Sequence, residues 1–118
     1  MRPMHSIFLT LSIIMLASCG TINSGLNIPP GEEFRLGENQ HGAFTVSAEN
    51  DGDVPVTVLS QDADGTRTKL ATLEPGAIAK QQFDANTVAV FLNETERGAQ
   101  LAVTIKGDTN LTMGYASE

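Results

Sequence analysis

The 118-residue chain has few of the side chains that cross-link a small domain or hold a metal in it. It contains one cysteine, two histidines, no tryptophan and one tyrosine. A single cysteine cannot form an intramolecular disulfide, and so few thiolate and imidazole groups argue against a zinc site. Any domain in this chain must therefore be stabilised by side-chain packing alone.

Positive charge is also scarce. Seven lysines and arginines stand against fourteen aspartates and glutamates, which gives a formal net charge of −7. Nucleic-acid binding depends on basic patches, so this balance argues against a nucleic-acid partner. An acidic surface of this kind is more typical of solubility than of a recognition surface.

The main apolar run lies at residues 7–17, near the N-terminus, and is almost wholly apolar, with only Thr10 and Ser12 as polar residues. Its length of about 11 residues falls well short of the roughly 20 that a membrane-spanning helix needs. The run follows a positive charge at Arg2 and ends in small residues, which is the layout of a secretory signal peptide. The run ends with Leu16-Ala17-Ser18-Cys19, so the only cysteine stands where such a peptide would be cut.

This tetrapeptide resembles the lipobox of bacterial lipoprotein precursors, in which an aliphatic residue and two small residues precede a cysteine. The resemblance implies that signal peptidase II cuts before Cys19, whose thiol carries diacylglycerol and whose amine is acylated, for example with palmitate. Two acyl chains give stable membrane anchoring. Gly20 stands where aspartate tends to retain a lipoprotein in the inner membrane, so an outer-membrane location is favoured. We therefore expect an exported, lipid-anchored protein of the cell envelope and periplasm.

The sequence predicts three segments. Residues 1–18 form the signal peptide, and residues 19–31 form the lipidated N-terminus and a flexible tether that contains Pro29 and Pro30. Residues 32–118 form one domain. Apolar and polar residues alternate along most of this last segment, which is the pattern of half-buried strands. Residues 87–92 form a continuous apolar run and predict a central strand.

Turn sequences separate the predicted strands. Asn50-Asp51-Gly52-Asp53 and Asp62-Ala63-Asp64-Gly65 are examples, and Pro75-Gly76 favours a type II turn. No segment shows a capped helical stripe. The fold class predicted is all-β: a small antiparallel β-sandwich of about seven or eight strands, immunoglobulin-like, with a jelly roll as the alternative. The cysteine and tryptophan hallmarks of antibody domains are absent, and the mature domain resembles no named family.

Catalysis is not expected. His41 is the only histidine after residue 18, and it lies in a polar stretch without a nucleophile motif, so we interpret it as a surface loop residue. The aromatic rings that could stack on sugars are few. Phe34, Phe44, Phe83 and Phe91 alternate like core residues, whereas Tyr115 is expected either at the surface or tucked under the sandwich.

Metal binding has only weak candidates. Asp62-Ala63-Asp64-Gly65 resembles the opening of a calcium loop, but Leu73 stands where an EF-hand requires glutamate. A calcium site made by Asp51, Asp53, Asp62 and Asp64 would require both turns to lie at one end of the sandwich. Ordinary acidic turns are the favoured interpretation, so no metal or cofactor is expected.

Two matches to the eukaryotic glycosylation sequon, at Asn93 and Asn110, are interpreted as chance because the lipobox implies a bacterium. The leading hypothesis is a non-enzymatic, lipid-anchored protein of the envelope that binds an envelope protein or a glycan, or has a structural role. The alternative is a calcium-dependent or carbohydrate- or small-ligand-binding module.

Overall fold

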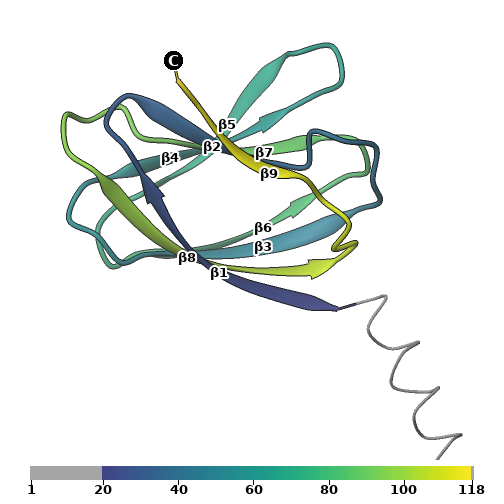
Figure 1. Ribbon diagram of the computed structural model, residues 1–118, viewed down its shortest axis with the longest axis horizontal. Coiled ribbons are helices and arrows are strands. Elements are labelled where there is room, and N and C mark those ends of the chain that lie inside the picture. The colour runs from purple at the N-terminus through teal and green to yellow at the C-terminus, as the bar shows by residue number, and fades with distance from the viewer. Residues whose placement is uncertain (1–19, 118) are drawn as a thin grey trace, which may run out of the picture.

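The computed structural model describes residues 20–117, and this part of the chain forms two antiparallel β-sheets packed face to face (Figure 1). It contains nine strands and no helix that could cross a membrane. The strands are β1 (Thr21–Ile28), β2 (Glu32–Leu36), β3 (Phe44–Asn50), β4 (Val56–Gln61), β5 (Arg67–Leu73), β6 (Ile78–Phe83), β7 (Val88–Leu92), β8 (Ala99–Gly107) and β9 (Met113–Ser117). The predicted all-β sandwich is confirmed.

The strand order is that of a jelly roll. One sheet, called sheet A, has the order β1-β8-β3-β6, and the other, sheet B, has the order β5-β4-β7-β2-β9. β4 pairs with β5, β3 with β6, β2 with β7 and β1 with β8, all antiparallel. The chain is therefore one long hairpin, with its tip at the β4–β5 turn, rolled into two sheets.

The immunoglobulin-like order, which was the first expectation, is not observed. It would place the first two strands side by side in one sheet, but here β1 and β2 lie in different sheets. Alternation in a sequence shows which face of a strand is buried, but it does not show which strands lie next to it in the sheet. The alternative, the jelly roll, is the order that the pairing shows.

The core lies between the sheets and is filled by the alternating residues of both. The four phenylalanines predicted as core are all at most 3 % exposed. The rings of Phe44 and Phe83 stack with their centroids 5.2 Å apart, and the ring centroids of Phe91 and Phe34 lie 6.4 Å apart. β7, predicted as a central strand, lies between β4 and β2 in the middle of sheet B. Tyr115 is 51 % exposed and contacts Phe34 edge-on at 5.1 Å.

The predicted flexible tether is wrong for most of its length, because Thr21–Ile28 form β1. This strand pairs with β8 over eight residues, from Thr21 opposite Lys106 to Ile28 opposite Ala99. Leu26 and Ile28 are buried in the core. The asparagines and glycine of β1 favour a loop locally, but long-range pairing with β8 satisfies the backbone and overrides that preference.

Candidate functional site

The lipobox residues 16–19 lie outside the described residues. Gly20 is the first residue described, and β1 begins immediately after it. The start of β1 therefore marks the end of the sandwich to which Cys19 is joined, and we call this the N-terminal end. The loops after β2, β6 and β8 and the β4–β5 turn lie at this same end (Figure 1).

The four aspartates considered for calcium do not meet. Asp51 and Asp53 precede β4, whereas Asp62 and Asp64 follow it, so the two pairs lie at opposite ends of a six-residue strand about 20 Å long. Asp53 accepts a hydrogen bond from Arg97 at 2.9 Å. Asp64 accepts one from the Thr66 backbone, which lowers the pKa of Asp64. The described residues contain no cluster of three or more metal-ligating side chains.

His41 is buried, which corrects the interpretation of a surface loop residue. Its side chain is 8 % exposed, and its ring lies edge-on against Phe44 at 5.2 Å. Nδ1 lies 2.7 Å from the Gly42 carbonyl oxygen, and Nε2 lies 2.9 Å from that of Gly37. Both ring nitrogens face the backbone, so His41 organises the β2–β3 loop and does not face a substrate.

The β2–β3 loop forms one wall of a polar groove at the N-terminal end. The groove has a volume of about 420 Å³, which lies within the range of small-ligand sites. The β4–β5 hairpin forms the opposite wall, and the β6–β7 loop closes the groove between them. The lining residues are Gly37, Glu38, Asn39, Gln40, Gln61, Asp62, Ala63, Asn86 and Val88. We call it the carboxamide groove, because Asn39, Gln40, Gln61 and Asn86 supply most of its polar side chains.

Hydrogen bonds to neighbouring loops hold the first wall in place. Asn39 Nδ2 donates to the Asn110 carbonyl at 2.7 Å, and Asn39 Oδ1 accepts from the Thr112 backbone at 3.0 Å. Asn86 adopts a positive φ of 64°, which asparagine tolerates better than most residues. In this conformation its Oδ1 accepts a hydrogen bond from His41 N at 3.1 Å. The wall is therefore formed before any ligand arrives.

A buried ion cluster holds the second wall. Arg67, at the start of β5, donates from Nη1 and Nη2 to the two carboxylate oxygens of Glu33, at 2.9 and 2.7 Å, and from Nε to Gln61 Oε1 at 2.8 Å. Glu33 lies in β2 on the outer face of sheet B, and is only 1 % exposed. Arg35 donates to the same carboxylate at 2.5 Å. These bonds tie the β4–β5 hairpin to β2 across the sheet.

The groove presents donors and acceptors that are not consumed by the fold. The side chains of Gln40 and Asp62 make no hydrogen bond within residues 20–117, and those of Asn39, Gln61 and Asn86 are oriented by the bonds above. Carboxamides donate and accept at once, and carboxylates accept. No lysine, arginine or aromatic ring lines the groove. This chemistry suits a neutral ligand rich in hydroxyl groups.

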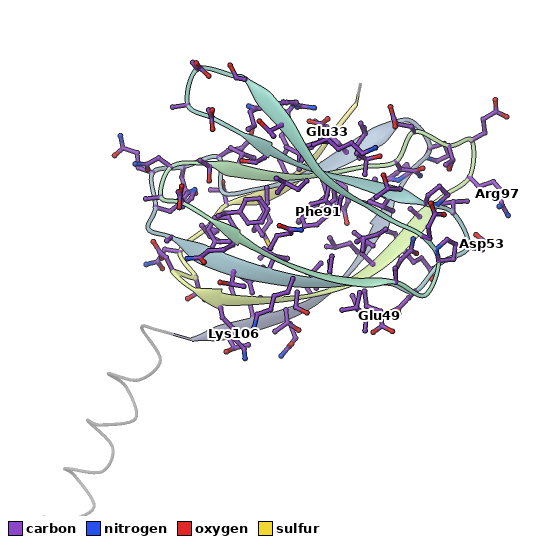
Figure 2. The ribbon with its side chains drawn as sticks, turned by 180° about the vertical axis from the view of Figure 1, so that it is seen from behind. Glu33, Glu49, Asp53, Phe91, Arg97 and Lys106 are labelled. Carbon is purple, nitrogen blue, oxygen red and sulfur yellow. The ribbon has the colours of Figure 1, made fainter. Side chains whose placement is uncertain are left out.

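A second concavity, of about 520 Å³, lies at the opposite end of the sandwich. Five of its nine lining residues are apolar or glycine, and its polar side chains are those of Asn27, Asp51, Asp53 and Gln100. Asp53 is already paired with Arg97, and both residues lie at that end in Figure 2. It offers fewer polar side chains for its size than the carboxamide groove does.

Sequence reasoning had assigned no role to Glu33, Gln61, Arg67 or Asn86. Arg35 lies two positions from Glu33, but the bidentate partner that ties Glu33 to the hairpin, Arg67, lies 34 positions away and leaves no local signal in the sequence. Asn93, one of the sequon matches, is fully buried, and its Nδ2 donates to the carbonyls of Ile28 and Arg97. A glycan could not be attached there in the folded domain.

Comparisons with known proteins identify a shared fold only. No family model and no curated sequence matches the chain. A cupin-superfamily sugar phosphate isomerase from Silicibacter pomeroyi is similar with a TM-score of 0.50 and 16 % identity, over 83 % of this chain and 57 % of that one.

Two further structures have lower scores. A family 29 carbohydrate-binding module has a TM-score of 0.48 and 13 % identity, over 77 % of this chain and 72 % of that one. The Yersinia pseudotuberculosis-derived mitogen has 0.46 and 8 %, over 80 % and 95 %. At these identities the likeness extends to the β-sandwich and not to any site.

Proposed function

We propose that this protein is a lipid-anchored, non-catalytic module of the cell envelope that binds a glycan in the carboxamide groove. The observation that carries the binding proposal is the convergence of four carboxamides and two carboxylates, from separate loops, on one preformed groove. Sugar hydroxyls both donate and accept hydrogen bonds, and planar amide and carboxylate groups can pair with adjacent hydroxyls. A wall fixed in advance reduces the entropy lost on binding.

The anchoring proposal rests on the sequence of residues 16–19, with the location of β1 as an added constraint. Cleavage before Cys19 would leave Gly20 alone between the lipidated residue and β1, so the whole of the jelly roll would remain in the mature protein. A cut that removed β1 would expose the edge of β8 and delete Leu26 and Ile28 from the core.

Glycan binding is tested by screening the purified protein against a panel of envelope-type oligosaccharides, followed by calorimetry. Gln40→Ala and Asp62→Ala should each weaken binding by about tenfold, equivalent to about 1.4 kcal/mol. Neither side chain makes a hydrogen bond within the described residues, so both variants should keep the melting temperature of the parent. Gln100→Ala, in the opposite concavity, is the matched control and should bind like the parent. Loss of binding in Gln100→Ala alone would show that the groove is not the site.

Anchoring is tested separately by mass spectrometry of the mature N-terminus and by membrane fractionation. The parent protein should begin at an acylated Cys19 and sediment with membranes. Cys19→Ala should lose the acyl mass and leave the membrane fraction. A parent protein without acyl groups would refute the anchor and leave the glycan proposal standing.

A further inference from the structure

The outer face of sheet A carries a second polar site, which neither the groove nor the anchor uses. It is a depression of about 210 Å³ lined by Thr45, Ser47, Lys80, Thr104 and Lys106, from strands β3, β6 and β8. These side chains point away from the core, because their neighbours Val46 and Ile105 are buried between the sheets. Figure 2 shows Lys106 on the outer side of sheet A, whereas Phe91 lies between the two sheets.

The strand register places two hydroxyl groups between two lysines. Lys106 on β8 is directly opposite Thr45 on β3, and Lys80 on β6 is directly opposite Ser47 on β3. Because β3 lies between β8 and β6, the two lysines approach the depression from opposite sides. Lysine side chains are long enough to reach a common point above the central strand.

The charge of this site is not balanced by the protein. Among residues 20–117, every arginine forms a salt bridge with a carboxylate, whereas Lys80 and Lys106 form none within 4.0 Å. Glu49 is the nearest acidic residue along β3, one outward-facing position beyond Ser47, and it makes no ion pair with Lys80. Two like charges over one depression repel each other, and a bound anion would remove that cost.

We propose that this depression binds a phosphate group, held by the ammonium groups of Lys80 and Lys106 and by the hydroxyls of Thr45 and Ser47. Both hydroxyls make no hydrogen bond within the described residues and can donate to phosphate oxygens. Thr104 already donates to Asn23 Oδ1 at 2.8 Å and forms the rim. Lysine binds phosphate as a point charge, and such bonds are stronger than neutral ones.

The position of the site leaves two sources for that phosphate. Lys106 is paired with Thr21, the first residue of β1, so the site lies near the N-terminal end. A membrane phospholipid headgroup and a soluble phosphate ester present the same chemistry there. The proposal is independent of the glycan site, which lies on other elements.

The test uses the full chain carrying Cys19→Ala, so that no lipid on the protein contributes. Inorganic phosphate, added at constant ionic strength against chloride, should raise the melting temperature by several degrees and perturb the amide signals of β3 and β8. The double variant Lys80→Gln, Lys106→Gln should lose at least tenfold in phosphate affinity. Lys69→Gln, an exposed lysine on β5 in the other sheet, is the matched control and should bind like the parent.

Vesicles distinguish the sources. Retention on phosphatidylglycerol vesicles but not on phosphatidylcholine vesicles, abolished in the double variant, would identify a headgroup. Phosphate binding without vesicle retention would identify a soluble ester. The proposal is overturned if inorganic phosphate has no effect beyond chloride, if the double variant binds it equally, or if vesicles retain the protein although inorganic phosphate does not bind.

Discussion

The ion cluster around Glu33 gives the most direct test of the structure. Glu33 is 1 % exposed, and its carboxylate is held by Arg67 from β5 and Arg35 from β2. Removing one partner of a buried pair typically costs 3–5 kcal/mol, because a buried charge loses its compensation. Arg35 remains in Arg67→Met, so we expect the lower end of that range, about 3 kcal/mol.

A loss of that size is easily measured. For a domain of about 100 residues, 1 kcal/mol corresponds to roughly 4 °C or more in melting temperature, so Arg67→Met should melt about 12 °C lower or more. Circular dichroism during heating and urea titration would report both quantities. Arg97→Met is the control, because the Arg97 and Asp53 side chains are 66 % and 75 % exposed. Such a surface pair contributes less than about 1 kcal/mol.

The double variant Glu33→Met, Arg67→Met tests whether the loss in Arg67→Met comes from the uncompensated charge of Glu33. It removes the buried carboxylate with its partner, so it should be more stable than Arg67→Met alone, although it carries one more substitution. Arg67→Met should also weaken glycan binding, since Arg67 positions Gln61 in the groove wall. Equal losses in Arg67→Met and Arg97→Met would refute a buried cluster, as would a double variant less stable than the single one.

Three further changes have defined outcomes. Asn93→Ala should cost about 3 kcal/mol in urea unfolding, because buried backbone carbonyls lose their donor. Hydrogen bonds, chiefly from Gly42 N, lower the pKa of Asp108 from its ordinary 3.8. The ionised Asp108 carboxylate therefore stabilises the fold above this pKa, and the stabilisation is lost as the pH falls through the lower pKa of the folded state. Asp108→Asn should lower the stability at neutral pH and make the stability decline less steeply in acid. Gly107→Ala should destabilise by about 2 kcal/mol or more in the same unfolding assay, because Gly107 has a φ of 109° and a Cβ would lie 2.8 Å from the Ala43 carbonyl.

Local sequence carries most of the strand assignments. Val56 and Val58 in β4 and Val103 and Ile105 in β8 alternate with polar residues, and all four are buried as predicted. β1 was not predicted as a strand because its asparagines and glycine are typical of a linker. Its strand conformation depends on pairing with β8, more than 70 residues later. Propensity is local, whereas this pairing is decided by the fold.

The candidate sites were harder to predict for the same reason. Gln40 and Gln61 are unremarkable in the sequence, and they share a groove only because the long hairpin brings the β2–β3 loop beside the β4–β5 turn. The calcium hypothesis required Asp51 and Asp62 to lie at one end. Residues that flank a single strand must lie at opposite ends of it, so knowing the bounds of β4 was enough to separate them.

The start of β1 also changes what an anchor at Cys19 would do. The sequence predicted a tether of about ten residues, which could extend to roughly 35 Å. With β1 beginning at Thr21, Gly20 alone separates the proposed lipidated residue from the folded domain, a span of about 7 Å. The N-terminal end would then be held against the membrane surface. Because the carboxamide groove opens at that end and Lys106 lies beside Thr21, both proposed ligands would have to be reached close to the bilayer. A surface glycolipid or a phospholipid headgroup meets that condition, and a polymer confined far from the membrane does not.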